Sequence, residues 1–345
     1  MKKTRVAING FGRIGRAFLK LASKREEIEI VAINDLGDIE NLAYLLKYDT
    51  AYGKSDLEIS VEKRDWKTVF VVNGKDIEFV QERDPAQLPW GEFDIDIVIE
   101  STGFFTEYSK AKAHLDAGAK RVVISAPAKG DPIEGVESAM VLMGINEDKL
   151  KTCQISSNAS CTTNASSPVI QILHETIGIE KAFLTTVHGY TSTQKLVDSP
   201  DSKDWRKGRA GAQNIIPSTT GAAKAVTKVI TDLEGVFDGI ALRVPVLTGS
   251  VADITFVTKR DTSVEEVNDM LKNAANEEKW KGIFTTTEEK IVSSDIVGTT
   301  FAATVDLDFT RVTGGNLVKV LSWYDNEIGY TNALIEHVIV MGKHI

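Results

Sequence analysis

A glycine-rich turn near the start of the chain does most to restrict the fold. The sequence Gly10-Phe11-Gly12-Arg13-Ile14-Gly15 follows an apolar run at residues 5–9 and opens residues 13–24, whose apolar side chains recur on one helical face. A second β-branched run follows at residues 30–34. Strand, glycine turn, helix and strand in this order form a βαβ unit, which places both strands in one parallel sheet. The N-terminal part of the chain is therefore predicted to be a doubly wound α/β domain.

The three glycines, Gly10, Gly12 and Gly15, have separate tasks if the turn binds a dinucleotide. The first allows a tight turn, the second lets the backbone approach a pyrophosphate, and the third lets helix and strand pack closely. Alone the pattern is weak, because a plain glycine turn has the same spacing. Here Asp35 follows the second strand about twenty residues after Gly15, where a carboxylate accepts hydrogen bonds from the adenosine ribose. The sequence thus predicts NAD, since the 2′-phosphate of NADP would face Asp35 as a like charge.

The rest of the first half continues the parallel sheet. Apolar runs at residues 95–100 and 121–125 flank a helix-like segment at 106–117. Residues 57–80 alternate polar and apolar side chains around Asn73-Gly74, which predicts an inserted antiparallel hairpin.

After residue 160 the pattern changes to a mixture of helices, strands and one long polar stretch. Helix-like segments fall at 161–178, 220–229 and 264–276, and strand-like segments at 182–187, 240–245, 251–259, 300–306 and 317–324. Such a mixture predicts an α+β domain with a mainly antiparallel sheet. We expect a Rossmann dinucleotide-binding domain from residues 1–160 and 326–345, the latter including a returning helix at 332–340. The catalytic domain is expected at 161–325.

Composition excludes several classes of function. With 345 residues and 42% hydrophobic content, the chain is long enough for two globular domains. A net charge of −9 argues against a dedicated nucleic-acid or membrane-surface partner. The apolar run Val6 to Ile8 is too short for a signal-peptide core, and no stretch is long enough to cross a bilayer. Two cysteines fit a reducing compartment, so a cytoplasmic protein is expected.

Cys161 is the candidate nucleophile. It stands in Ser157-Asn158-Ala159-Ser160-Cys161-Thr162-Thr163-Asn164, a run of small polar residues that leads into a helix-like segment. Exposed amides at a helix N-terminus favour the thiolate, so we expect a lowered pKa. A lone cysteine is more often a small buried hydrophobe, which remains the interpretation for Cys153. Pro168 leaves the helix start open, as either a first-turn residue or a kink.

His188 is the candidate base. It follows the β-branched run Thr185-Thr186-Val187 and precedes a glycine, so it stands at the end of a strand. An imidazole near a thiol can take its proton and later the hydroxyl proton of the adduct. The spacing by itself does not establish their contact. The other histidines are expected to be solvated or structural: His114, His174, His337 and His344.

Together these features resemble the glyceraldehyde-3-phosphate dehydrogenase family over essentially the whole chain. The similar segments are INGFGRIGR, VAINDL, ERDP, SNASCTTN, TTVHGYT, NIIPSTTGAAKAV, LRVPV and SWYDNEIGY. The resemblance implies NAD-dependent oxidative phosphorylation of D-glyceraldehyde 3-phosphate to 1,3-bisphosphoglycerate, through a thioester on Cys161, in glycolysis or gluconeogenesis. It implies no metal. It also implies a homotetramer, since the polar loop after His188 resembles one that packs on a neighbouring subunit.

The resemblance further implies a role for each matching residue. Cys161 is the nucleophile, and His188 is the base that, with the Cys161 amide, steadies the oxyanion. Cofactor contacts are implied at Arg13, Ile14, Arg83, Ser125, Asn326 and Tyr330, of which Asn326 holds the nicotinamide carboxamide. Thr191 and Arg243 are implied to bind the substrate phosphate, and Ser160, Thr162, Thr220 and Gly221 the inorganic phosphate.

Some positions depart from the family pattern or leave alternatives open. Lys207 stands where some relatives have an arginine, so the basic partner of inorganic phosphate is one of Arg206, Lys207 and Arg209. Arg243 taken alone fits a solvated residue on the outer face of a strand. Ala165 and Gly37 replace a cysteine and a threonine that are common in relatives, and the Gly37 change loosens the preference for NAD. Residues 52–80 are longer than usual, which predicts a surface embellishment.

Two alternative functions remain at this stage. An erythrose-4-phosphate dehydrogenase shares the nucleophile motif but departs after the histidine, and His188-Gly189-Tyr190-Thr191 matches the triose enzyme better. A noncatalytic NAD- or RNA-binding module is disfavoured by the joint presence of Cys161, His188 and Asn326.

Overall fold

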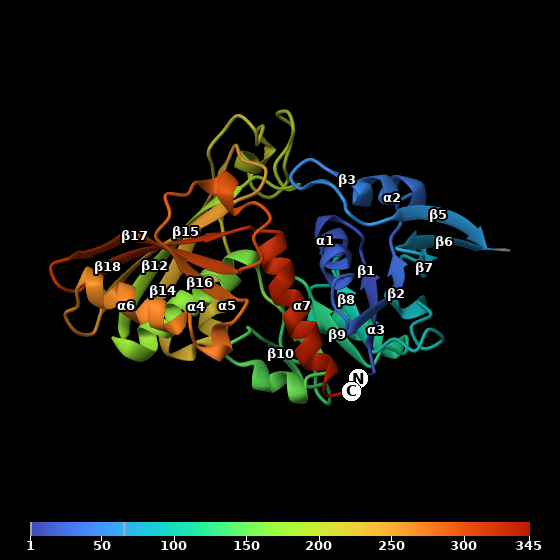
Figure 1. The fold of residues 1–345 in the computed structure, drawn as a ribbon, viewed down its shortest axis with the longest axis horizontal. Coiled ribbons are helices and arrows are strands. Elements are labelled where there is room, and N and C mark those ends of the chain that lie inside the picture. The colour runs from blue at the N-terminus through green and yellow to red at the C-terminus, as the bar shows by residue number, and fades with distance from the viewer. Residues whose placement is uncertain (1, 65–66) are drawn as a thin grey trace. The chain divides into compact units, whose positions relative to one another are not determined.

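The computed structural model describes residues 2–64 and 67–345, and the chain divides into two compact units (Figure 1). Unit 1 comprises Met1–Val141, Asn146–Ala159 and Leu334–Ile345, and unit 2 comprises Leu142–Ile145 and Ser160–Ala333. These compact units assign residues 326–333 to unit 2, whereas the sequence-based partition groups them with the cofactor domain. Residue 1 of that partition and residues 65–66 of the expected hairpin lie outside the described residues.

Unit 1 is built on a nine-stranded sheet in the order β10-β11-β9-β8-β1-β2-β7-β6-β5. Its strands are β1 (Thr4–Asn9), β2 (Ile28–Asn34), β5 (Ile59–Arg64), β6 (Lys67–Val72), β7 (Lys75–Val80), β8 (Ile97–Glu100), β9 (Arg121–Ile124), β10 (Ser138–Met140) and β11 (Ile155–Ser157). All neighbours from β10 to β7 are parallel. The chain order along β7-β2-β1-β8-β9-β11 is the doubly wound order, in which a dinucleotide binds at the carboxyl ends near β1. The predicted Rossmann fold is confirmed.

The helices of unit 1 begin where the strands end. They are α1 (Arg13–Ala22), α2 (Ile39–Lys47), α3 (Tyr108–Asp116) and the part of α7 (Ile328–Gly342) that starts at Leu334. The predicted βαβ unit is present as β1, α1 and β2, and its strands pair in parallel. Short strands β3 (Tyr48–Asp49) and β4 (Gly53–Lys54) form a separate pair.

The predicted hairpin at Asn73-Gly74 is present between β6 and β7. Both turn residues have positive φ, 50° and 74°, as a tight turn between antiparallel strands requires. However, β7 also pairs in parallel with β2, from Ala32 opposite Glu78 to Asn34 opposite Val80. The interpretation of residues 52–80 as a surface embellishment is therefore wrong for β7, which is an integral strand of the doubly wound sheet.

Unit 2 is built on a seven-stranded sheet in the order β13-β14-β12-β15-β18-β17-β16. Its strands are β12 (Ile179–Gly189), β13 (Ile216–Thr219), β14 (Phe237–Val244), β15 (Ser250–Thr258), β16 (Phe284–Thr287), β17 (Ala303–Thr313) and β18 (Leu317–Tyr324). The pairs β12–β14 and β16–β17 are parallel and the others are antiparallel. The prediction of a mainly antiparallel sheet is confirmed.

Three helices cover one face of this sheet: α4 (Cys161–Thr176), α5 (Ala222–Val229) and α6 (Val264–Ala274) (Figure 1). Their apolar faces and the inward strand residues form one core, which includes Leu173, Ile254 and Leu271. Burying each such side chain stabilises the fold by roughly 1.5–3 kcal/mol. Along β15 every second residue is buried, as a strand with one covered face requires. None of the described helices is long and apolar enough to span a membrane.

Candidate active site

The glycine turn of unit 1 meets the steric requirements of a dinucleotide site. Gly10 has φ +95°, and a Cβ there would lie 2.6 Å from the Thr102 amide nitrogen. A Cβ at Gly15 would lie 2.2 Å from the Gly10 carbonyl oxygen, whereas one at Gly12 would meet no atom within 4 Å. Gly12 is the N-cap of α1, and because it has no side chain it leaves open space beside the start of the helix. This open helix terminus fits the pyrophosphate of a dinucleotide.

Asp35 lies beside this turn at the end of β2 and links two backbone segments. Its Oδ2 accepts a hydrogen bond from the Phe11 amide at 2.7 Å, and its Oδ1 accepts one from the Gly37 amide at 2.8 Å. Each carboxylate oxygen has further acceptor capacity, which suits a ribose hydroxyl. Asp35 therefore also fixes the glycine turn, which the sequence pattern did not reveal.

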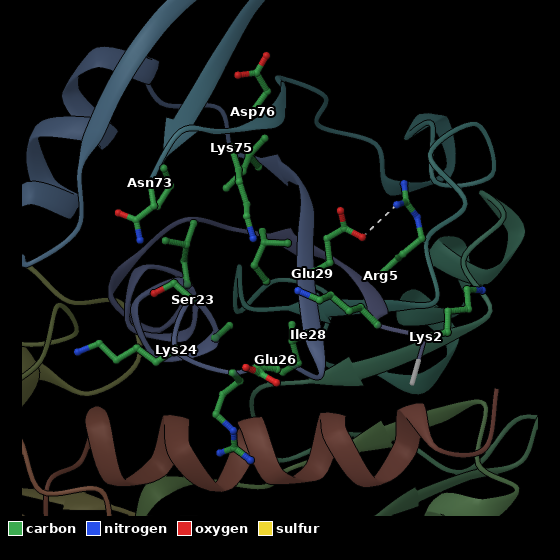
Figure 2. Close-up of a pocket in the computed structure, with 17 residues that line it drawn as sticks. Lys2, Arg5, Ser23, Lys24, Glu26, Ile28, Glu29, Asn73, Lys75 and Asp76 are labelled. Atoms are coloured by element: carbon green, nitrogen blue, oxygen red, sulfur yellow. Dashed lines mark hydrogen bonds and ion pairs between the residues drawn. The ribbon is translucent and has the colours of Figure 1, made fainter.

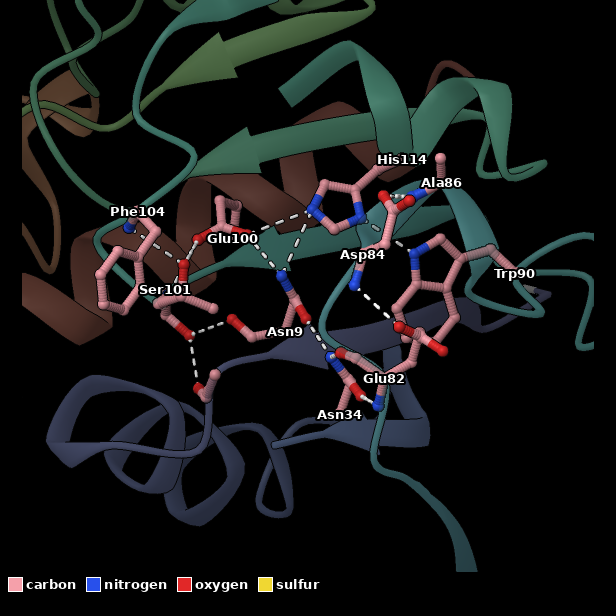
Figure 3. A network of polar contacts seen from close by, with 12 residues as sticks. Asn9, Asn34, Glu82, Asp84, Ala86, Trp90, Glu100, Ser101, Phe104 and His114 are labelled. Atoms are coloured by element: carbon pink, nitrogen blue, oxygen red, sulfur yellow. Dashed lines mark hydrogen bonds and ion pairs between the residues drawn. The ribbon is translucent and has the colours of Figure 1, made fainter. Parts of the chain in front are cut away.

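A buried polar network underlies the turn and joins three strand ends (Figure 3). The carboxylate of Glu100, at the end of β8, accepts hydrogen bonds from Asn9 Nδ2 at 2.6 Å and from the Thr102 amide at 2.8 Å. Trp90 Nε1 donates to His114 Nδ1 at 3.0 Å, so the single proton of a neutral His114 is on Nε2, which donates to Glu100 at 3.1 Å. His114 is thus buried and structural.

Asn34 extends this network to the loop that carries Arg83. Its Nδ2 donates to Asn9 Oδ1 at 2.7 Å and to the Glu82 carbonyl at 2.8 Å, and its Oδ1 accepts from the Glu82 amide at 2.8 Å. The network therefore holds the loop at the carboxyl ends of β1, β2 and β8. Sequence reasoning missed it, although Asn9, Asn34 and Glu100 all stand at the ends of predicted strands.

The other expected cofactor residues of unit 1 lie around the same edge of the sheet. Arg13 is exposed, donates to Asp49 Oδ1 at 3.2 Å and lies 5.9 Å from the Tyr52 ring centroid. Ile14 and Ser125 are half-buried, and Arg83 is exposed. The Ser125 amide donates to the Glu100 carbonyl at 2.9 Å, directly after β9.

A cavity of about 1050 Å³ in unit 1 is distinct from this edge (Figure 2). Lys24 after α1, Ile28 at the start of β2 and Lys75 at the start of β7 line it. The glycine turn follows the opposite, carboxyl end of β1. The cavity is therefore not part of the candidate cofactor site.

In unit 2 the structure brings Cys161 and His188 together. Cys161 is the first residue of α4, whose N-cap Ser160 accepts a hydrogen bond from the Thr163 amide at 3.1 Å. His188 lies near the end of β12, and its Nε2 is 3.4 Å from Cys161 Sγ. Because α4 begins at Cys161, Pro168 lies inside the helix, and the alternative that it is a first-turn residue is wrong.

Arg243 lies against the other side of the imidazole. β12 and β14 pair in parallel with His188 opposite Arg243, so the two side chains share a face of the sheet. Arg243 Nη1 is 2.6 Å from His188 Nδ1 and 3.2 Å from the Gly189 carbonyl, to which it donates. Arg243 is half-buried. The alternative that Arg243 is a solvated residue on the outer face of its strand is therefore wrong.

The pKa values of Cys161 and His188 are both shifted in the direction that favours the neutral side chain. Burial raises the pKa of the Cys161 thiol, against the opposing effects of the Arg243 charge and of hydrogen bonding with Thr162. Burial and then the Arg243 charge lower the pKa of His188 to about 3, against a hydrogen bond with Gly189. The expectation of a lowered thiol pKa is wrong for this state, because loss of hydration outweighs the helix terminus.

Tyr324 is a further residue of the site that sequence reasoning missed. It ends β18, is buried, and its ring meets the His188 ring edge-on at a centroid distance of 5.9 Å. Its Oη lies 2.8 Å from Thr162 Oγ1 and 2.7 Å from Thr186 Oγ1. The tyrosine therefore joins the start of α4 to β12 beside the histidine. The only sequence feature that could have indicated a role for Tyr324 is its position in the segment SWYDNEIGY, which is similar to the family.

Apart from Arg243, the expected anion-binding residues of unit 2 lie on three segments. Thr191 Oγ1 is 2.9 Å from Thr193 Oγ1, in the polar loop after β12. Gly221 is the N-cap of α5, and Thr220 Oγ1 accepts from the Ala222 amide at 3.1 Å. Thr162 differs from these residues, because its side chain is buried and its hydroxyl contacts Tyr324.

The three basic candidates for inorganic phosphate differ in their pairing. Arg206 pairs with Asp204 at 2.9 Å, and Arg209 pairs with Asp198 at 2.7 Å. Lys207 forms no ion pair with any described residue and is half-buried. Among these cations, Lys207 is thus the one without an ion pair, although its charge acts on the nearby carboxylates of Asp201 and Asp204.

Asn326 and Tyr330 lie in unit 2, where both are buried. Asn326 Oδ1 accepts from Ser250 Oγ at 2.9 Å and lies 3.2 Å from Thr248 Oγ1. Hydroxyl donors on its oxygen fix the orientation of the amide. The Asn326 amide nitrogen donates to none of the described residues.

The doubly wound sheet with its glycine turn defines the chain as a dinucleotide-binding protein. A family model described as "Glyceraldehyde 3-phosphate dehydrogenase, NAD binding domain" matches residues 4–108, and one described as the C-terminal domain matches residues 160–326. The chain belongs to the glyceraldehyde-3-phosphate dehydrogenase family.

Curated relatives with that name match nearly the full length. The protein of Streptomyces coelicolor is 48% identical over 344 residues, 99% of either chain. Those of Geobacillus stearothermophilus and Bacillus subtilis are 49% identical over 334 residues and 47% identical over 341 residues, covering 96% and 98% of either chain.

Proposed function

We propose that the chain oxidises D-glyceraldehyde 3-phosphate to 1,3-bisphosphoglycerate with NAD and inorganic phosphate, through a thioester on Cys161. The observation that carries this proposal is the 3.4 Å distance between Cys161 Sγ and His188 Nε2 at the start of α4. Cys161 Sγ adds to the aldehyde carbon while His188 accepts the thiol proton. The Cys161 amide and His188 stabilise the oxyanion. NAD, when bound, accepts the hydride from that carbon.

Release of the product requires a second anion. An oxygen of inorganic phosphate attacks the thioester carbonyl, and the Cys161 thiolate leaves. We assign the substrate phosphate to Thr191 and Arg243, and inorganic phosphate to Ser160, Thr162, Thr220, Gly221 and Lys207. The exposed N-cap Gly221 of α5 supports the second assignment, as does Lys207, which forms no ion pair among the described residues, since helix N-termini and cations bind phosphate.

The cofactor is assigned to the edge of the doubly wound sheet. The open turn at Gly10, Gly12 and Gly15, with Arg13 and Ile14, receives the pyrophosphate, and Asp35 the adenosine ribose. Arg83 and Ser125 serve the adenine and nicotinamide ends, and Asn326, with Tyr330 nearby, holds the carboxamide. In functional terms the cofactor domain is residues 1–160 and 326–345, and the catalytic domain is 161–325.

We further propose a cytoplasmic homotetramer. The polar loop at residues 190–214 carries Leu196, Val197 and Trp205, whose side chains are 86%, 70% and 87% exposed. Apolar side chains this exposed are typical of a surface covered by another copy of the chain.

Turnover of triose phosphate with NAD and phosphate tests the proposal. Wild-type enzyme reduces NAD only when phosphate or arsenate is present, and Cys161→Ser abolishes the reaction although the protein keeps its fold by circular dichroism. The Cys153→Ser variant is the control and retains activity. Faster turnover of erythrose 4-phosphate would favour the sibling enzyme, and no turnover of either aldehyde would contradict catalysis.

A further inference from the structure

Glu100 and His114 in unit 1 are a buried titratable pair that the proposed chemistry does not use. Neither side chain has any exposed surface, and His114 Nε2 lies 3.1 Å from Glu100 Oε2. A carboxylate buried in this way is stable only when hydrogen-bond donors surround it. Because both side chains are enclosed, neither can touch a bound cofactor. Any effect of this pair on cofactor binding must therefore pass through the residues that it holds.

Trp90 fixes the tautomer of His114. An indole N–H can only donate, so Trp90 Nε1, 3.0 Å from His114 Nδ1, requires a lone pair on that nitrogen. The proton of the ring is then on Nε2, which donates to Glu100. Asn9 Nδ2 also lies 3.4 Å from Nε2, but it donates to Glu100 at 2.6 Å. Trp90 therefore sets the direction in which His114 donates.

From Glu100 the hydrogen bonds run to two pieces of backbone (Figure 3). Glu100 Oε2 accepts from Asn9 Nδ2, so Asn9 Oδ1 is free to accept from Asn34 Nδ2 at 2.7 Å. Asn34 Oδ1 in turn accepts from the Glu82 amide at 2.8 Å. The other carboxylate oxygen, Oε1, accepts from the Thr102 amide at 2.8 Å. Each side-chain amide has only one orientation that satisfies its neighbours, so the network acts as a unit.

These two pieces of backbone lie beside the groups assigned to the cofactor. Asn34 and Glu82 directly precede Asp35 and Arg83, to which the adenosine end is assigned. At the other piece, the Thr102 nitrogen would lie 2.6 Å from a Cβ on the first glycine of the turn. The network therefore supports the glycine turn and both adenosine contacts from behind.

We propose that Glu100 and His114 are positioning residues for NAD, which hold the groups that bind its adenosine end in place before the cofactor arrives. This inference rests on the proposed function, which assigns the cofactor to this edge of the sheet. A site that is already in its binding conformation loses less conformational freedom on binding, so it binds more tightly. Loss of the His114 bond leaves the buried carboxylate with one donor fewer and releases the side chains that follow it. NAD then binds more weakly, whereas the chemistry at Cys161 is unchanged.

Two substitutions at position 114 test this role. His114→Leu fills the space without a donor for Glu100, and it should raise the Kd for NAD roughly tenfold, the scale of one hydrogen bond to a charge. Its kcat at saturating NAD should stay within about twofold of wild type. His114→Gln carries an amide nitrogen near the position of Nε2 and should restore the affinity. Calorimetry and steady-state kinetics measure the two quantities. An unchanged Kd in His114→Leu, or an equal loss of affinity in both variants, overturns the proposal.

Leu150→Ala is the matched control for a loss of stability alone. Leu150 is fully buried in unit 1, and its carbonyl accepts from Arg121 Nη1 at 2.6 Å at the start of β9, the end away from the glycine turn. This variant should lower the free energy of unfolding, as His114→Leu does, but keep the wild-type Kd for NAD. If Leu150→Ala raises the Kd as much as His114→Leu does, affinity follows stability and the positioning role is wrong.

Hydrogen exchange of the wild-type protein tests the network without any variant. In the absence of NAD, the Glu82 and Thr102 amides should exchange at least about tenfold more slowly than the Arg83 amide, which donates to none of the described residues. Equal exchange at the three amides would show that the network does not form before the cofactor binds. That result overturns the proposal even if His114→Leu does not fold.

Asp35→Ala distinguishes failure of this inference from failure of the proposed function. If Asp35→Ala binds NAD as tightly as wild type, the cofactor is not at this edge of the sheet, and both proposals fail. If Asp35→Ala weakens binding whereas His114→Leu does not, the placement of the cofactor stands and only the positioning role is wrong.

Discussion

Gly12 and Gly15 stand in one turn but differ in what surrounds them. A Cβ at Gly15 would overlap the Gly10 carbonyl oxygen at 2.2 Å, whereas a Cβ at Gly12 would meet nothing within 4 Å. Gly15 is required by packing, and Gly12 by the proposed approach of the cofactor. Sequence spacing cannot separate these two reasons.

Alanine at the two positions should therefore give different defects. Gly15→Ala lowers the free energy of unfolding by about 1–3 kcal/mol, because the backbone must move to admit the methyl group. Gly12→Ala leaves unfolding nearly unchanged and raises KM for NAD at least several-fold. Urea unfolding and steady-state kinetics measure the two effects, and equal stability losses would contradict the distinction.

The lowered pKa values of two buried histidines determine how the free energy of unfolding should depend on pH. Burial lowers the pKa of His337 to about 3, and burial with the Arg243 charge does the same for His188. Between about pH 6.5 and pH 3 the unfolded chain therefore binds more protons than the folded chain. The contribution of these two histidines to the free energy of unfolding is fully present above this range and is lost as the pH falls through it. Each histidine contributes a slope of up to roughly 1.4 kcal/mol per pH unit.

His337→Gln tests this dependence at a residue outside the proposed catalytic and binding residues. Urea unfolding at a series of pH values should show a shallower loss of stability on acidification than wild type. The exposed His344→Gln is the control and keeps the wild-type slope. A His337→Gln slope equal to wild type would show that His337 does not gain a proton on unfolding.

At the scale of elements, the start of α4 combines a structural cap with the proposed chemistry. Ser160 Oγ accepts from the Thr163 amide at 3.1 Å, and α6 has the same arrangement, in which Ser263 Oγ accepts from the Glu266 amide at 3.2 Å. The two caps are therefore a matched pair of which only one precedes the nucleophile.

Alanine at either cap should cost about 1 kcal/mol of unfolding free energy, since one helix amide loses its partner. Ser160→Ala should in addition lower kcat, because Cys161 is the next residue and Ser160 is assigned to inorganic phosphate. Ser263→Ala should leave kcat unchanged. Equal kcat in both variants would remove Ser160 from the catalytic proposal.

The helices and strands with strong periodicity could be predicted from sequence. The strands of the βαβ unit are continuous apolar runs, whereas α1, α6 and β15 each have one apolar face, and the structure confirms all of them within a few residues. Short strands such as β13 and β16 were missed, because four residues show too little alternation. The pairing of β7 with β2 was also missed, since its partner lies far away in the sequence.

At the scale of the whole molecule, the exposed side chains of the loop at residues 190–214 predict self-association. Leu196→Glu should lower the association state measured by sedimentation, because a charge replaces an apolar side chain in the proposed contact. Val292→Glu is the matched control at an exposed valine outside the loop and should leave association unchanged. Equal sedimentation of Leu196→Glu and wild type would contradict a subunit contact at this loop.

Local sequence determined the elements and the identity of the reactive groups. Three features could be recognised because neighbouring residues alone determine their backbone geometry and chemistry. They are the glycine turn, Asp35 after β2 and the polar run at Cys161. Tertiary structure alone decided which side chains meet: β12–β14 register puts Arg243 on His188, and packing of β18 puts Tyr324 beside His188. It also decided the titration of Cys161, because loss of hydration depends on neighbours that are distant in the chain and outweighs the helix terminus visible in the sequence.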